Sequence, residues 1–195
     1  MAIASIMGNI SRVVLWRHEL NLKAFLLFSG VGVPAAALGA NTLWIIPANI
    51  SNLCIGLFFI ALIPLRHLAK RKGFTLNQVH LLIAGAVLGY LTGMVFSTGP
   101  LLLPVFSGFG LTKGALLATE AAASFALYAS KSIAFGALGV LKQEVVFAGV
   151  LVGLSLMLGN YLGKLFVLKI SERMFNVLLD AMLFLAGISM LWAMI

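Results

Sequence analysis

The segment FSTGPLLLPVFSGFG, Phe96–Gly110, interrupts a very apolar chain with two prolines, three glycines and three small hydroxyl residues. Pro100 and Pro104 each remove a backbone donor and disfavour regular helix, while glycine permits other backbone turns. Irregular backbone at membrane depth persists only where protein or a watery cavity satisfies its polar groups. The segment therefore predicts a broken helix near Gly99–Pro104 that faces a cavity rather than lipid.

The rest of the chain has the composition of a membrane protein. Hydrophobic residues make up 62% of the 195 residues and charged residues only 9%, which is far from the mixture in soluble domains. A bilayer core of about 30 Å needs roughly 20 apolar residues per helix. The predicted fold is an all-α, polytopic transmembrane helix bundle. Its predicted spans are 24–43, 48–65, 79–98, 114–138, 145–163 and 174–195.

The formal charge of +8 does not indicate nucleic acid, because basic residues gather in short clusters between apolar runs. Clusters at 12–23 and 66–73 are typical of cytoplasmic loops facing anionic lipid. The predicted location is the cell inner or plasma membrane, with several crossings. The basic residues within 164–173 fall on the opposite side if three crossings precede them, so the orientation of the second part stays open.

The sequence lacks the motifs of an enzyme. Cys54 is the only cysteine, so there is no internal disulfide or thiol metal cluster. There is no HExxH, GxSxG or phosphate-binding Walker motif, and these are the usual signs of metalloprotease, hydrolase and nucleotide chemistry. We therefore expect neither catalysis nor a metal or organic cofactor.

Glycines recur at helical spacing in several predicted spans. Gly85, Gly89 and Gly93 form one stripe, and 149/153 and 159/163 form two more. Small residues at this spacing let helices approach closely in lipid, so we interpret these stripes as packing surfaces rather than chemistry.

A shift of about 120 residues aligns the chain weakly with itself. Ser11-Arg12 falls on Ser130-Lys131, and Leu38-Gly39 falls on Leu158-Gly159 after a one-residue gap. We interpret 1–72 as a partial first repeat, with about two spans plus a helix fragment, and 73–195 as a complete second repeat. Because the second repeat contains the broken segment and the first does not, we also expect about 40 further residues before Met1.

The sequence resembles the TauE/SafE family of membrane transporters. The resemblance is carried by 85–132, 156–165 and 170–191 and covers 80–195 well; residues 1–65 look like the rest of a first half. It implies two related halves, each opening with a broken helix at a glycine-rich segment, and export of sulfite, sulfonates or other small organosulfur anions. Here Ser97-Thr98-Gly99-Pro100 stands where the family usually has a run of glycines, which leaves the substrate open.

The broken segment is the first candidate site. A half-helix N-terminus directs free N–H groups and a positive dipole end towards the break, and small hydroxyls add donors. Ser97, Thr98, Gly99 and Pro100 therefore form a candidate cradle for a small anion. The alternative is a plain loop between two spans.

Charged residues inside the spans are the second candidate. Glu120 and Lys131 lie eleven residues apart, so they share a helix face with Ser124 and stand roughly 16 Å apart along the axis. Lys131 is a candidate counter-charge for an anion or a snorkelling residue, and Glu120 a proton carrier or a structural ion pair. The repeat adds Arg12, the counterpart of Lys131, and predicts that both basic groups face one central cavity. Asp180 is expected to make an interhelical hydrogen bond.

Together these features predict a secondary transporter, in the exporting direction, that moves a small anion by alternating access between two repeats. The alternatives are a non-transporting membrane assembly or partner subunit and an anion channel. The expected partners are the anion and membrane lipid, and homo-oligomer formation is left open.

Overall fold

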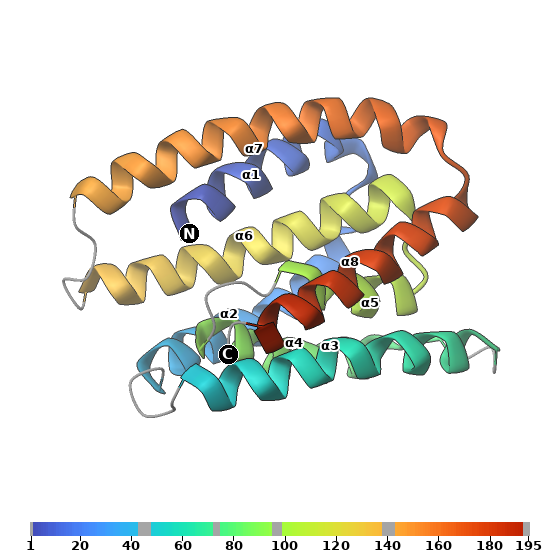
Figure 1. Cartoon of the computed structure of the whole chain (residues 1–195), viewed down its shortest axis with the longest axis horizontal. Helices are drawn as coiled ribbons and strands as arrows, with labels where there is room; N and C mark the ends of the chain where they lie inside the picture. Colours follow the sequence, from blue (N-terminus) through green and yellow to red (C-terminus); the bar gives the residue numbers. More distant parts are fainter. Residues whose placement is uncertain (1, 43–47, 72–74, 95–98, 138–142, 193–195) are drawn as a thin grey trace.

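The computed structural model describes residues 2–42, 48–71, 75–94, 99–137 and 143–192. These residues form eight α-helices and a short 3-10 helix (Figure 1). Their bounds are α1 (Ala2–Leu15), η1 (Arg17–Glu19), α2 (Leu22–Thr42), α3 (Ala48–Arg71), α4 (Gln78–Met94), α5 (Gly99–Gly108), α6 (Lys113–Ala137), α7 (Gln143–Lys169) and α8 (Glu172–Trp192).

The all-helical prediction is confirmed for the described residues. Each of the six predicted spans corresponds to one helix, from α2 to α4 and from α6 to α8. By length and composition, two of the described helices qualify as membrane crossings, Leu22–Asn41 in α2 and Phe147–Lys169 in α7. The arrangement as two repeats stays a prediction.

The broken segment contains more helix than the prolines suggested. α5 begins at Gly99 and continues through Pro104 to Gly108, so the expectation that Pro104 blocks regular helix is wrong. Pro100 lies in the first turn, where a proline costs little because amides there have no helical acceptor, whereas Pro104 lies inside the helix and removes one backbone bond without ending it. Residues 95–98 lie outside the described residues.

The basic run 66–73 was expected as a loop, but its first part belongs to α3, which continues to Arg71. Leucine, alanine, lysine and arginine all favour helix, and nothing in 66–71 breaks one. Similarly, α7 continues to Lys169, so Lys164 and Lys169 are helical.

The glycine stripe of α4 packs directly on α2. A Cβ atom at Gly85, Gly89 or Gly93 would overlap backbone atoms of Phe28, Gly32 or Ala36, respectively. Only glycine allows the two backbones to approach so closely, so the packing interpretation is confirmed for this stripe. In α7, a Cβ at 149 or 153 would overlap α1 side chains, whereas none would meet a neighbour at 159 or 163.

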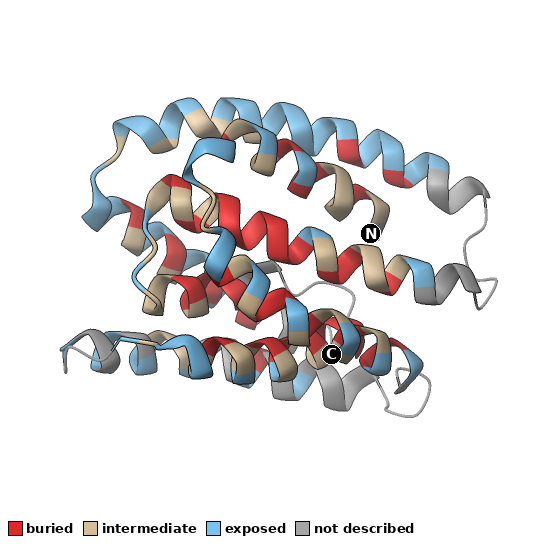
Figure 2. Ribbon diagram, turned by 180° about the vertical axis from the view of Figure 1, so that it is seen from behind, coloured by how far each residue is buried: buried red, intermediate tan, exposed pale blue. Residues whose placement is uncertain are grey.

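α6 lies at the centre of the bundle (Figures 1 and 2). Its buried face is built mostly from alanine, including Ala118, Ala121 and Ala123, and these small side chains leave room for α1, α2 and α5 to pack against it. The preceding corner is a Schellman motif: Leu111 N–H donates to Phe106 O at 3.1 Å and Gly110 N–H to Ser107 O at 3.0 Å. Gly110 has φ +96°, the left-handed conformation that such a helix end requires.

Asn21 connects the start of α2 to α6. Its side-chain oxygen accepts a hydrogen bond from Ala24 N–H at 2.9 Å, which is an N-cap contact. Its own N–H donates to the buried hydroxyl of Thr119 at 3.1 Å. The first turn of α2 is thereby held beside Glu120, the next residue of α6.

α7 lies along one edge of the molecule, and α1 lies between it and α6 (Figure 1). Only 6% of its apolar window 147–169 is buried, and Leu158, Leu162 and Phe166 are all exposed. Large exposed apolar surfaces are rare on soluble monomers. This face of α7 is therefore suited to contact with lipid.

Candidate functional site

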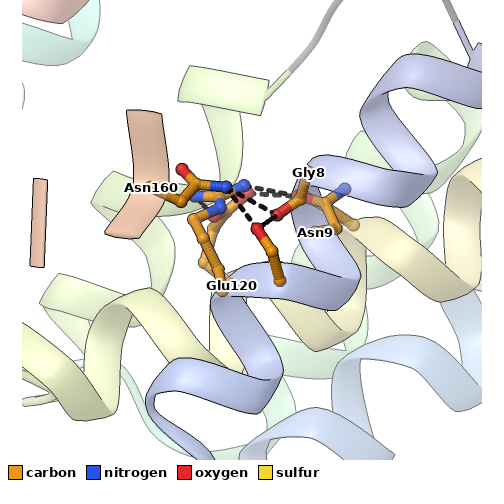
Figure 3. A network of polar contacts seen from close by, with 7 residues as sticks. Gly8, Asn9, Glu120 and Asn160 are labelled. Atoms are coloured by element: carbon orange, nitrogen blue, oxygen red, sulfur yellow. Dashed lines mark hydrogen bonds and ion pairs between the residues drawn. The ribbon is translucent and has the colours of Figure 1, made fainter. Parts of the chain in front are cut away.

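The candidate site is an ion pair between α1 and α6. The Nη1 atom of Arg12 lies 2.6 Å from Oε2 of Glu120, and the two residues are 108 positions apart in the chain. The side chain of Glu120 is 1% exposed and that of Arg12 is 25% exposed. The carboxylate therefore lies inside the bundle, within the polar network drawn in Figure 3, while the guanidinium is partly accessible to solvent.

Two polar side chains complete the pair. Ser124 Oγ donates to the other carboxylate oxygen of Glu120 at 2.6 Å, and the second terminal nitrogen of Arg12 donates to Asn9 Oδ1. Helical spacing explains both contacts, because residues three or four positions apart share a helix face. Asn9 is 3% exposed and Ser124 2% exposed. A buried charge needs such partners, since an unpaired one is costly.

A second polar contact joins α1 to α7 next to this pair. The amide of Asn160 donates to Gly8 O at 2.8 Å and to Ser11 Oγ at 2.7 Å (Figure 3). Lys164 donates to Leu15 O at 2.6 Å and lies 5.0 Å from the ring centroid of Trp16. Lys164 thus binds a carbonyl at the C-terminal end of α1, where carbonyl groups run out of helical amide donors. These contacts fix the helical turn that carries Arg12.

Lys131 lies about three helical turns away from Glu120 along α6. It is 2% exposed and donates to Thr92 O of α4 at 3.0 Å. Snorkelling to the surface is therefore excluded for Lys131. The structure places Arg12 at Glu120 and Ser124, whereas Lys131 is roughly 16 Å further along the axis of α6.

The predicted cradle is described only in part. Ser97 and Thr98 lie outside the described residues. Gly99 and Pro100 are the first residues of α5, as expected for the start of a half-helix. Their part in binding an anion stays a prediction.

The expected interhelical hydrogen bond of Asp180 is confirmed. Its Oδ2 atom lies 2.9 Å from Nε2 of His67 and joins α8 to α3. Ser130, which precedes Lys131, donates to Val33 O of α2 at 3.1 Å.

Sequence reasoning found Arg12, Glu120 and Ser124 but missed Asn9, Asn160 and the role of Lys164. Each missed residue is a polar side chain within an otherwise apolar run. Since buried polar groups in apolar helices almost always find a partner, this pattern was the available signal. The partners themselves depend on how the helices pack.

The basic group at the site suits the binding of an anion. The arginine fork matches the oxygens of an oxyanion, and the buried carboxylate of Glu120 holds that fork between α1 and α6. Among the described residues no group of three or more His, Cys, Asp or Glu side chains forms a metal-binding cluster.

Comparison with known proteins yields one family. The chain matches the family described as Sulfite exporter TauE/SafE over residues 1–190. No curated protein and no solved structure matches it. Proteins of this family are membrane transporters of sulfite-type anions rather than enzymes. Because the match covers nearly the whole sequence, and includes both α1 and α6, the chain belongs to the TauE/SafE sulfite exporter family.

Proposed function

We propose that this chain is a multi-pass transporter of the cell inner membrane that exports a small anion, such as sulfite or an organosulfonate. The observation that carries the proposal is the Arg12–Glu120 pair between α1 and α6. Ionisable groups are expensive inside a membrane and usually mark an ion or substrate pathway. A part-exposed arginine beside a buried carboxylate, Asn9 and Ser124 offers both a counter-charge and hydrogen-bonding groups.

The proposed anion contact is the guanidinium of Arg12. Arginine carries five N–H donors in a rigid plane, and its bonds to Glu120 and Asn9 involve its two terminal nitrogens. A sulfite or sulfonate group has oxygens that can accept a pair of parallel bonds from this fork. Each charge-assisted bond contributes about 1.5–3 kcal/mol, so loss of Arg12 should weaken binding roughly tenfold to a hundredfold.

Lys131 and the start of α5 are proposed as further contacts for the anion on its way through the bundle. Lys131 is proposed as a second counter-charge on the same route, reached at a different stage, because one small anion cannot span roughly 16 Å. The start of α5 supplies amide donors and a positive dipole end, with Ser97, Thr98, Gly99 and Pro100 as the proposed cradle.

Alternating access between two repeats is the proposed mechanism. The contacts of the two repeat-related serines support it. Ser11 of α1 accepts from Asn160 in α7, and Ser130 of α6 donates to α2. In the predicted repeat, α1 matches α6 and α2 matches α7. The contact of α1 with α7 is therefore equivalent to the contact of α6 with α2, as expected for two related halves around one site. With no ATP-binding motif in the sequence, the proposed driving force is an ion gradient or the gradient of the anion.

Reconstitution into liposomes tests the proposal. Sulfite, thiosulfate, taurine and sulfoacetate are each loaded inside, and uptake of the labelled anion is measured against the outward gradient. A carrier shows counterflow, a channel shows flux without counterflow, and an assembly subunit shows no flux. Arg12→Gln should abolish or strongly reduce counterflow. Arg17→Gln is the matched control, since Arg17 is exposed and bonds only to its neighbour His18 among the described residues.

A further inference from the structure

We infer that the anion and one proton bind together. The carboxylate of Glu120 is paired with the guanidinium of Arg12, and it releases the guanidinium to the anion only when it takes up a proton. This inference rests on the proposed function and adds the coupled ion and the order of exchange. It follows from the geometry of one pair of side chains, and each step is argued below.

The first step is competition for one guanidinium. Arg12 Nη1 already lies 2.6 Å from a carboxylate oxygen of Glu120. An incoming sulfonate needs the same donors, and it carries the same sign of charge as the carboxylate. Two anions at one partly buried guanidinium repel each other. The anion therefore binds well only when the negative charge of Glu120 is removed.

The second step is the fate of Glu120. Its side chain is 1% exposed, so water cannot replace Arg12 as a partner. A buried carboxylate without a counter-charge takes up a proton instead of remaining ionised. Ser124 can serve both forms, because a hydroxyl donates to a carboxylate and accepts from a carboxylic acid. Release of Arg12 to the anion is thus linked to protonation of Glu120.

The surroundings leave Glu120 with one partner of opposite charge. Arg12 from α1 is the only charged side chain that contacts it in the described part of the chain. The other charged or titratable groups on α6 and on the described elements that pack against it are Lys23, His80, Tyr90, Lys113, Tyr128, Lys131, and the exposed Arg17, His18 and Glu19 of η1. None of these has a contact to Glu120 among the described hydrogen bonds and ion pairs.

The exchange conserves charge at the site. The empty site holds Arg12 as a cation and Glu120 as an anion. The loaded site holds the same cation, a monovalent anion and a neutral acid, after uptake of one anion and one proton. Both states are neutral overall, so neither carries an uncompensated charge through the low-dielectric interior. Anion and proton then cross in the same direction, so that export is driven by the outward gradient of the anion, which carries the proton with it.

Linkage gives the sign of the pH dependence. Where the empty site is ionised, binding takes up one proton per anion, so the apparent affinity should fall tenfold for each unit of increase in pH. The probe must keep a constant charge itself, which sulfite does not. Methanesulfonate meets this condition between pH 5.5 and 8.5.

The experiment measures methanesulfonate binding and proton uptake by the full chain in detergent micelles. Wild-type protein should take up about one proton per bound anion, read with an indicator dye in weak buffer, and should lose affinity as pH rises. Glu120→Gln, which keeps the shape but not the charge, should take up no proton and bind equally well across the range. Glu172→Gln neutralises an exposed carboxylate of α8 and should behave as wild type.

The outcomes separate this inference from the proposed function. If wild-type protein binds the anion without proton uptake and with constant affinity, the coupling is wrong while anion binding stands. If Glu120→Gln still takes up a proton, another group carries it. If wild-type protein binds neither methanesulfonate nor the sulfur anions of the transport assay, the proposed function itself fails. Should Glu120→Gln not insert, the wild-type measurement still decides whether the anion and a proton bind together.

Discussion

Gly39 of α2 lies against the carbonyl group of Tyr90 in α4, so closely that a Cβ atom at residue 39 would overlap the carbonyl oxygen. Gly159 of α7, its partner in the predicted repeat, has no atom within 4 Å of the same position. The two glycines therefore make a matched pair for measuring what close helix packing contributes to stability.

Gly39→Ala should destabilise the protein by about 1–3 kcal/mol, the usual range for overpacking a tight contact. The added methyl group meets backbone, which cannot move aside as a side chain can. Gly159→Ala should be neutral or slightly stabilising, because alanine favours helix and nothing obstructs it. Denaturant unfolding in mild detergent would measure both. Equal effects of the two substitutions would contradict the close packing of α2 on α4.

Arg12→Gln should cost about 3–5 kcal/mol of stability, because it leaves Glu120 as a buried carboxylate without a counter-charge. The double variant Arg12→Gln/Glu120→Gln removes both charges and should recover much of that loss. The same unfolding assay compares the single and double variants at neutral pH. A double variant no more stable than Arg12→Gln would show that the pair does not hold α1 on α6.

Lys131→Gln should reduce transport, and its effect should add to that of Arg12→Gln. The two residues contact different partners, Thr92 O and Glu120, and sites more than about 10 Å apart usually act independently. Counterflow rates and anion affinities of both single variants and the double variant test this. A loss in the double variant smaller than the sum would instead indicate the single shared cavity predicted from the repeat.

Gly99→Leu should abolish transport and leave membrane insertion intact. A bulky side chain at the first residue of α5 would block the approach of an anion to the amides of that turn. The control is Gly30→Leu, because a Cβ at Gly30 has no neighbour within 4 Å. Normal transport by Gly99→Leu would place the anion cradle elsewhere.

Periodicity and composition predicted the helices well because both are local properties. Runs of about 20 apolar residues gave α2, α4 and α8 within a few residues. The extension of α3 to Arg71 was missed because clustered charges were interpreted as a loop, although the same residues favour helix. Pro104 was misjudged because an interior proline removes one helical hydrogen bond but does not by itself end a helix.

The candidate site was predictable as a set of residues but not as a set of contacts. Glu120, Ser124 and Arg12 stood out because charged and hydroxyl groups are rare in these apolar runs. That Arg12 meets Glu120 rather than Lys131 depends on α1 crossing α6 near its start, which no local pattern encodes. Asn9 and Asn160 became visible as members of the network only through that crossing and the packing of α7 on α1.

The hydrogen bond from Asn21 to Thr119 has a mechanical consequence. Thr119 and Glu120 are neighbours in one turn of α6, so a displacement of that turn either breaks this bond or pulls the start of α2 along. Because the glycine contacts hold the backbones of α2 and α4 directly against each other, α4 would have to move together with α2. The unit that moves with Glu120 then includes α2 and α4 as well as this turn of α6, so a restraint on α4 would also restrain the carboxylate without touching it.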